Sequence, residues 1–259
     1  MIILMNSSKT MNFGQPAHIS KHSVPEFSKD CEILVNELQK LTVSDFSGLM
    51  GVSEKLAKLN VRRYKNWQTS PGVSEAKQAL LAFKGDIYAA MDVDNYNSKT
   101  FDFAQKHLRI LSGLYGILRP LDLIQPYRLE MATKMNTGRG KNLYRFWGNR
   151  ITTYLNETIK RESSGVLVNL ASAEYFKAAN PGLLKADIIT PVFKEYKDPV
   201  YRVIAIYAKK ARGSMCDFIL RNSITRVEDL QAFNLDGYRF APAQSSAKEW
   251  VFTRGDVAA

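Results

Sequence analysis

Apolar runs with the composition of buried strands lie near both ends of the chain, with amphipathic helical patterns between them. Residues 2–5 and 166–170 predict two such strands, and a 3.6-residue apolar stripe predicts a helix over 26–41. Strands at both ends around a largely helical middle favour an α+β fold. We expect a single domain over 1–259, with one mixed, curved β-sheet surrounded by helices and with the first and last strands paired.

Capping residues and β-type runs predict the other elements. Ser44 and Ser53 are expected N-caps of two helices, and Ser74, Ser98 and Ser172 of three more. The other expected helices cover 74–82, 98–107, 142–162, 172–179, 208–222 and 226–232. Two hairpins are also expected, one pairing 187–196 with 200–207 and the other pairing 238–241 with 249–253.

The charge balance indicates a polyanionic partner. The chain has 36 Lys and Arg against 25 Asp and Glu, a formal net charge of +11. Such a field favours nucleic acid or a phosphorylated small ligand, and the alternative is a basic surface that meets no polyanion. Two cysteines make no disulfide framework, and no run approaches the ~18 apolar residues that span a bilayer. We therefore expect a cytoplasmic protein without a membrane partner.

The segment 108–124 carries two glycines, Gly113 and Gly116, inside an apolar frame. One helix ending near Gly113 and another starting after Gly116 would present free backbone amides to a phosphate. This arrangement resembles a helix-hairpin-helix, with Arg109 and Arg119 on its flanks. The alternative is a buried strand followed by a glycine turn. Pro120 fits only the first turn of a helix that starts near Leu118.

Further basic segments extend the expected contact surface. Cations near the start of the helix at 208–222 oppose the helix dipole, which indicates an anion there or, alternatively, solvated charge. Lys9 follows the first strand, where hydroxyls and a lysine suit a phosphate. Basic, aromatic and glycine residues interleave around Lys84 and Arg128. The expected nucleic-acid contacts are Lys9, Lys84, Arg109, Ser112, Gly113, Gly116, Arg119, Arg128, Lys209, Lys210 and Arg212.

Searches for catalytic and metal motifs return little. The three histidines, His18, His22 and His107, have no metal-ligand spacing, so we expect neither metal nor cofactor. A lysine beside a carboxylate can act as an amine nucleophile if its pKa is depressed. The side chains of interest for such chemistry are Lys9, Asp86, Glu130 and Lys209.

Four segments resemble, in the same order, the YaaA family of peroxide stress proteins: 82–88, 108–131, 169–177 and 207–213. The resemblance implies a bacterial protein made under hydrogen peroxide stress and associated with limiting free iron and DNA damage. It also implies binding of double-stranded DNA through a helix-hairpin-helix beside a positive cleft. The chain departs from the family at Asn6-Ser7-Ser8-Lys9-Thr10, where Ser-Pro-Ala-Lys-Thr is usual, and at Asn149, where an acid is usual.

Two functional hypotheses remain. The first is a monomeric, non-enzymatic protein that grips the backbone of duplex DNA with little sequence preference, with Lys9, Lys84, Arg119 and Lys209 lining one cleft. The alternative is an enzyme that acts on DNA or a nucleotide, in the manner of a lyase or glycosylase, with a lysine and a carboxylate. Direct iron binding ranks last.

Overall fold

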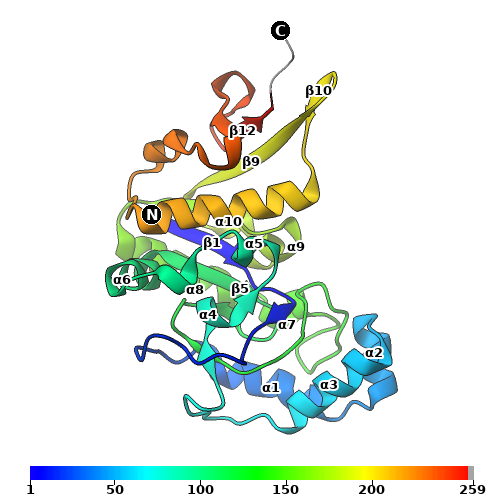
Figure 1. The fold of residues 1–259 in the computed structure, drawn as a ribbon. Coiled ribbons are helices and arrows are strands. Elements are labelled where there is room, and N and C mark those ends of the chain that lie inside the picture. The colour runs from blue at the N-terminus through cyan, green and yellow to red at the C-terminus, as the bar shows by residue number, and fades with distance from the viewer. Residues whose placement is uncertain (256–259) are drawn as a thin grey trace.

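The computed structural model describes residues 1–255, and its backbone is organised around one eight-stranded sheet (Figure 1). The strand order is β11-β12-β9-β8-β1-β5-β6, and β10 pairs with β9 off this path. The strands are β1 Ile2–Asn6, β5 Leu108–Ser112, β6 Gly116–Leu118, β8 Val166–Asn169, β9 Asp187–Lys197, β10 Val200–Arg202, β11 Arg239–Phe240 and β12 Glu249–Arg254.

The middle of the sheet is parallel. β1 lies between β5 and β8, β8 pairs with β9, and β9 pairs with β12, all in the parallel sense. Parallel strands covered on both faces are apolar along their whole length, and residues 2–5 of β1 are all fully buried. The expected pairing of the first and last strands is wrong, because β5 and β8 occupy both edges of β1. The two strands nevertheless belong to one sheet.

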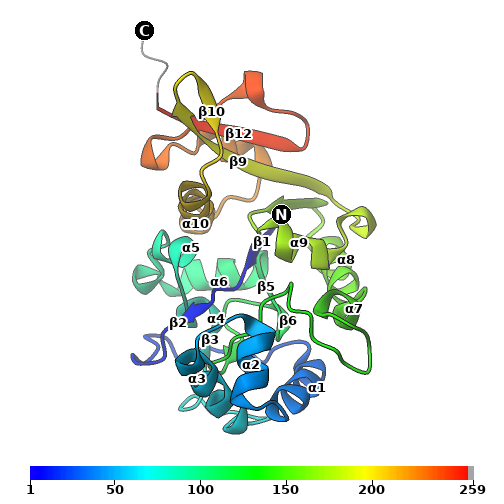
Figure 2. The same cartoon turned by 90° about the vertical axis from the view of Figure 1, so that its right-hand side faces the viewer.

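Helices cover the sheet, and four short strands form two small ladders beside it. Figures 1 and 2 show α10 lying between the β9–β12 end and α5, while α1, α2 and α3 form the opposite end of the molecule. The helices and short strands are α1 Ser28–Gln39, α2 Val43–Met50, α3 Glu54–Lys65, α4 Ala79–Ala82, α5 Asp86–Ala89, α6 Ser98–His107, α7 Leu143–Trp147, α8 Arg150–Glu162, α9 Ala173–Phe176, α10 Ala205–Arg221, β2 Thr10–Met11, β3 Lys77–Gln78, β4 Phe83–Lys84 and β7 Leu123–Ile124.

Several expected elements are confirmed, and two expected helices are broken or shortened. The helices expected at 26–41 and 98–107 are confirmed, and so are both C-terminal strand pairs, although residues 205–207 of the expected strand belong to α10. The helix expected at 142–162 is broken at Gly148 into α7 and α8, and only α4 survives of the one expected at 74–82. No helix within residues 1–255 is long and apolar enough to cross a membrane.

Residues 108–118 form a β-hairpin, so the prediction of two helices in the segment 108–124 is wrong and the alternative, a buried strand followed by a glycine turn, is confirmed. β5 and β6 pair antiparallel, with Ser112 opposite Gly116. The continuous apolar run offers no polar face, which suits a strand buried on both sides better than an amphipathic helix. Pro120 lies in a turn after β6, where the Asp122 amide donates to the Arg119 carbonyl at 3.2 Å. Proline favours the second position of such a turn.

Gly113 allows another chain segment to pack directly on this hairpin. A Cβ at Gly113 would lie 2.3 Å from the Leu129 carbonyl oxygen, so only glycine fits there without displacing backbone. Trp147 fixes the same turn, because its Nε1 donates to the Gly113 carbonyl at 3.0 Å. The backbone of residues 129–130 therefore packs directly against this turn.

Candidate nucleic-acid interface

The carboxyl ends of β1, β5 and β8 meet at one edge of the sheet, where polar side chains gather. The Ser172 amide donates to Asn6 Oδ1 at 2.9 Å, which ties the end of β8 to the end of β1. The Ser7 amide donates to the Leu111 carbonyl at 2.8 Å, and the Tyr88 hydroxyl donates to the Asn6 carbonyl at 2.9 Å. These bonds hold the loop that carries Lys9 in one place.

Three charged side chains form a strand-end cluster, which we define as Lys9, Arg128 and Glu130. The Glu130 carboxylate lies 3.0 Å from Lys9 Nζ through one oxygen and 3.0 Å from Arg128 through the other. Lys84 lies opposite Thr10 in the β2–β4 ladder, but its Nζ lies 3.7 Å from the Asp94 carboxylate, so it is not part of this cluster. Lys9 is 59% exposed, so the cluster presents a cation to solvent beside a carboxylate.

Uncharged hydroxyls line the interior beneath the strand-end cluster. The Ser112 and Tyr127 hydroxyls lie 2.7 Å apart. Burial raises the pKa of Tyr127, and burial raises the pKa of Tyr175 to about 12. Both phenols therefore stay protonated at neutral pH, and the charge at this edge comes from the strand-end cluster.

A helical hairpin lies at residues 43–65, where α2 and α3 are joined by Gly51, Val52 and Ser53. Gly51 ends α2 in the left-handed region, with φ of 59°, and its amide donates to the Ser47 carbonyl. Ser53 precedes α3 but its side chain does not cap the helix. Within residues 1–255, the first amides of α3, at 54–56, have no protein acceptor.

The outer surface of this α2–α3 hairpin is basic. Lys55, Arg62 and Lys65 are exposed, and Lys58 pairs with Glu54 at 2.6 Å. Ala57 is fully buried, on the inner side of α3. The first turn of α3 therefore offers free amides beside Lys55 and the Glu54 carboxylate, whereas Arg62 and Lys65 lie in its last turn.

A cavity of about 410 Å³ separates the α2–α3 hairpin from the strand-end cluster. Gly48, Leu49 and Met50 of α2 line one side, and Glu130 and Glu174 line the other. Figure 2 shows α2 and α3 beneath the end of β1 and near β2. The hairpin and the cluster are thus neighbours on one side of the molecule.

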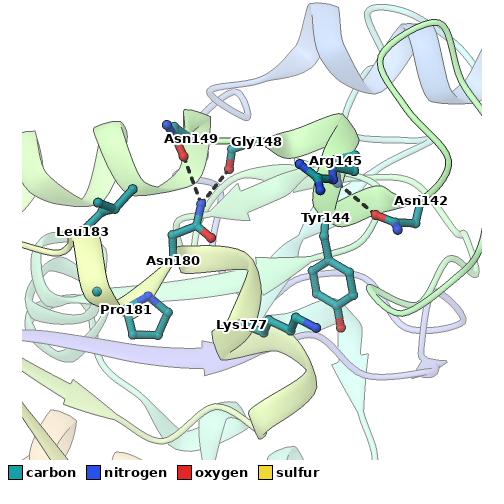
Figure 3. Close-up of a pocket in the computed structure, with 10 residues that line it drawn as sticks. Asn142, Tyr144, Arg145, Gly148, Asn149, Lys177, Asn180, Pro181 and Leu183 are labelled. Carbon is teal, nitrogen blue, oxygen red and sulfur yellow. Dashed lines mark hydrogen bonds between the residues drawn. The ribbon is translucent and has the colours of Figure 1, made fainter.

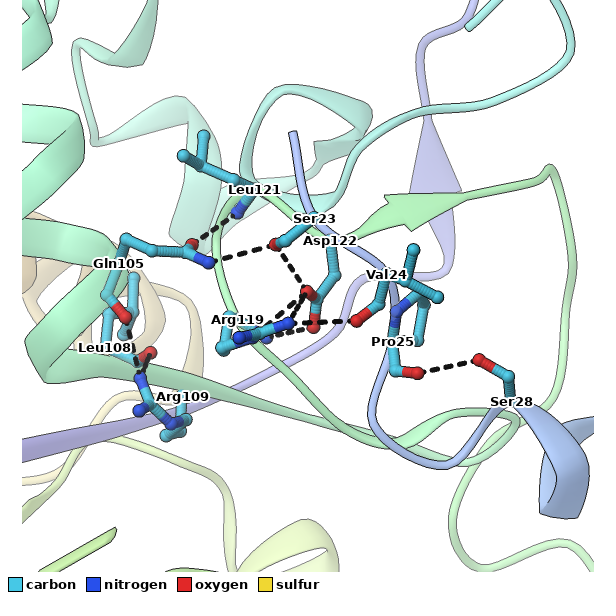
Figure 4. Close-up of polar contacts among 10 residues, drawn as sticks. All are labelled: Ser23, Val24, Pro25, Ser28, Gln105, Leu108, Arg109, Arg119, Leu121 and Asp122. Atoms are coloured by element: carbon cyan, nitrogen blue, oxygen red, sulfur yellow. Dashed lines mark hydrogen bonds and ion pairs between the residues drawn. The ribbon is translucent and has the colours of Figure 1, made fainter. Parts of the chain in front are cut away.

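Four of the expected contact residues lie in the interior. Arg109 is 6% exposed and Ser112 is fully buried, and Gly113 and Gly116 are buried too. Arg109 donates to the backbone carbonyls of Gln105 and Leu108 (Figure 4), and burial lowers the pKa of its guanidinium. These residues have no free surface for a duplex, because the segment forms buried strands rather than a surface hairpin of helices.

Arg119 is committed to an internal network (Figure 4). Its Nη2 donates to Asp122 and to the Val24 carbonyl, each at 2.9 Å. Asp122 is 1% exposed and also accepts from the Ser23 hydroxyl at 2.6 Å. Arg119 therefore fastens the loop at 23–24 to the turn after β6, and it is not part of the strand-end cluster.

The basic residues of α10 lie on another part of the surface. The helix begins at Ala205, so Lys209 and Lys210 fall after its first turn and do not crowd its N-terminus. Both are exposed, and Lys210 shares a cavity of about 440 Å³ with Asp86 of α5. Arg212 is partly buried, which lowers the pKa of its guanidinium. Lys210 and Asp86 are brought together by the packing of α5 on α10.

The two helices of the α2–α3 hairpin were expected from Ser44 and Ser53, but their connection was not singled out as a phosphate contact, although a local signal was present. Gly51 follows an apolar helical stretch and Ser53 opens the next one, which is the glycine-then-cap order of a tight connection between helices. Ser44 was expected to cap the first helix, whereas Thr42 caps it and forms a capping box with Asp45. Within residues 1–255, no group of three or more His, Cys, Asp or Glu side chains is placed to hold a metal ion.

Comparisons with known proteins cover almost the whole chain. A family model described as peroxide stress protein YaaA matches residues 1–244. A UPF0246 protein of Teredinibacter turnerae is 48% identical over 254 residues, which cover 98% of this chain and 99% of that protein.

Proposed function

Because the chain belongs to the peroxide stress protein YaaA family, we propose that it acts in the hydrogen peroxide stress response by binding the backbone of duplex DNA. One observation carries the proposal: the α2–α3 hairpin has uncapped amides and exposed cations beside the strand-end cluster. The hairpin supplies the contact that the family resemblance leads us to expect, at 43–65 and not at 108–124.

The amides at 54–56 suit a phosphate oxygen. They lie at the start of a twelve-residue helix, where the helix dipole favours negative charge. Ser53 leaves them free, and Lys55 adds a cation at the same turn. Contacts of this kind reach the sugar-phosphate backbone and carry no base information, so little sequence preference is expected.

The test is binding of two unrelated duplexes across a salt series, followed by fluorescence anisotropy. If about five phosphates are neutralised, log K falls against log salt with a slope near −4.5. Lys55→Gln should make that slope shallower by about 0.9, whereas Lys160→Gln, an exposed lysine on α8, should leave it unchanged. A flat salt response, or equal losses in both variants, would sink the proposal.

We propose further that the protein acts as a cytoplasmic monomer and that its effect on iron-dependent damage follows from covering DNA. Duplex DNA exposed to ferrous iron and peroxide should be cleaved less when the protein is present. Lys55→Gln should protect less well than Lys160→Gln at equal concentration. Equal cleavage with and without the protein would exclude shielding, and sedimentation would report the oligomeric state.

A second candidate function is chemistry on DNA, favoured by the 3.0 Å pair of Lys9 and Glu130. In an abasic site, the Lys9 amine would add to the C1′ aldehyde carbon and lose water to form an imine, with Glu130 accepting the ammonium proton. Borohydride would deliver hydride to that imine and leave a stable amine link. No adduct, or an adduct that survives both Lys9→Ala and Lys209→Ala, would remove this candidate.

A further inference from the structure

A second cavity, of about 980 Å³, lies between the α7–α8 break and the 3₁₀ segments Lys177–Ala179 and Pro181–Leu183 (Figure 3). We call it the amide pocket, because three amide side chains line it: Asn142, Asn149 and Asn180. Neither the duplex contact nor the lysine chemistry proposed above uses it.

The charge in the amide pocket is positive. Arg145 and Lys177 line it, and its lining residues include no carboxylate. Lys177 Nζ lies 5.0 Å from the centre of the Tyr144 ring, which holds the ammonium beside an aromatic face. The Tyr144 hydroxyl donates to the Glu174 carbonyl at 3.0 Å, and burial raises the pKa of this phenol, so it remains neutral. An anion entering the pocket would meet two cations and no opposing charge.

The amides are held in place while keeping free hydrogen-bonding atoms. Asn180 Nδ2 donates to the Gly148 carbonyl at 3.2 Å and to Asn149 Oδ1 at 3.0 Å. Asn149 is the N-cap residue of α8, yet its side chain does not cap the helix. Within residues 1–255, Asn180 Oδ1 and Asn149 Nδ2 have no partner, so one acceptor and one donor remain for a ligand.

We propose that the amide pocket binds a nucleotide. Arg145 and Lys177 would take the phosphate, because both cations pair well with phosphate oxygens. The free donor and acceptor of Asn149 and Asn180 match the paired donors and acceptors on the edge of a base. Tyr144, Pro181 and Leu183 supply the faces against which a base ring packs, and the cavity volume is that of a small-ligand site.

The amide pocket is close to the proposed DNA surface. Glu174 in α9 lines the cavity beside the α2–α3 hairpin, and Lys177, three residues later, lines the amide pocket. The nucleotide therefore has two conceivable sources that share one chemistry: a free nucleotide or a nucleotide of a single strand. Competition between the two separates them.

The experiment is calorimetric titration of the full chain with the four deoxynucleoside monophosphates and, separately, with inorganic phosphate. At least one monophosphate should bind with one-to-one stoichiometry. The double variant Arg145→Gln/Lys177→Gln should bind it at least about tenfold more weakly, since it removes both charge-assisted bonds to the phosphate. Asn180→Gly keeps the backbone, whose φ is 46°, and should weaken nucleotide binding without weakening phosphate binding. Lys160→Gln is the matched control.

Inorganic phosphate that binds as tightly as every monophosphate, or unchanged nucleotide binding by the double variant, would overturn the proposal. Displacement of the bound monophosphate by a single-stranded oligonucleotide assigns the pocket to a strand, and its absence assigns it to a free nucleotide. Affinity for duplex DNA should differ by less than about twofold between the double variant and wild type at matched salt, apart from the general charge effect that Lys160→Gln measures. The two proposals can therefore fail separately.

Discussion

The ammonium of Lys9, in the loop that follows β1, lies 3.0 Å from the carboxylate of Glu130, in the segment that packs against Gly113. This pair joins two segments that lie far apart in the sequence. It also limits the free positive charge at the strand ends, because Arg128 shares the same carboxylate.

Removing the positive charge of this pair should lower DNA affinity, and removing the negative charge should raise it. Lys9→Gln should weaken binding and make the salt slope shallower by about 0.9, if Lys9 meets one phosphate. Glu130→Gln should strengthen binding roughly twofold to fivefold, because it removes a carboxylate worth about 0.5–1 kcal/mol to a neighbouring cation. Anisotropy at three salt concentrations measures both. Changes of the same sign would contradict a phosphate contact at this pair.

Gly113→Ala should destabilise the fold by about 2–3 kcal/mol, since the added Cβ would have to displace the Leu129 carbonyl from 2.3 Å. Gly48→Ala is the matched control. A Cβ at Gly48, inside α2, meets nothing within 4 Å, so this change should leave stability equal or raise it by up to ~1 kcal/mol. Urea unfolding followed by circular dichroism gives both values. Similar midpoints for the two variants would refute the close-packing role of Gly113.

Arg119→Gln should reduce stability and leave DNA affinity unaltered. The change leaves the buried Asp122 carboxylate without its cation, at a cost of about 2–3 kcal/mol. The control is Arg161→Gln on α8, where an 81% exposed arginine lies 3.7 Å from Glu157 and contributes at most ~0.5 kcal/mol. Thermal melts and anisotropy should be measured on the same preparations. A selective loss of affinity without loss of stability would restore Arg119 as a DNA contact.

His107 should make the protein less stable in mild acid. Burial lowers the pKa of this imidazole from its ordinary value near 6.5. The Met1 carbonyl at 2.9 Å and the Glu162 carboxylate at 3.1 Å raise the pKa, but the effect of burial is larger. The unfolded chain then binds a proton near pH 6.5 that the folded chain does not. This contribution to stability is therefore present above pH ~6.5 and is lost as the pH falls through the folded-state pKa.

Urea midpoints at pH 7.5 and pH 5.5 check this expectation. The fall between the two values should be smaller in His107→Gln than in wild type. His22→Gln, at an exposed histidine, should retain the wild-type fall. An equal fall in all three proteins would show that other groups set the acid sensitivity.

The candidate site was predictable only in part. The strand exit at Lys9 and the carboxylate at Glu130 were singled out from the sequence, and the structure brings these two together. Their pairing could not be predicted, because it depends on how closely residues 129–130 approach the Gly113 turn. The amide pocket was not predicted, since its lining comes from helix ends at 142–149 and 177–183 that meet only in three dimensions.

Local patterns in the sequence determined the long elements, such as α1 and the β9–β10 hairpin, because their periodicity requires only a few neighbouring residues. They also determined the basic charge and the resemblance to the family. Tertiary structure alone decided that 108–118 is a buried hairpin, because an apolar run fits a buried strand or a buried helix equally well until its neighbours are known. Tertiary structure also decided which arginine side chains are exposed to solvent and which have partners inside the protein. Arg109 and Arg119 are drawn inward by backbone carbonyls and Asp122, partners that no local pattern shows.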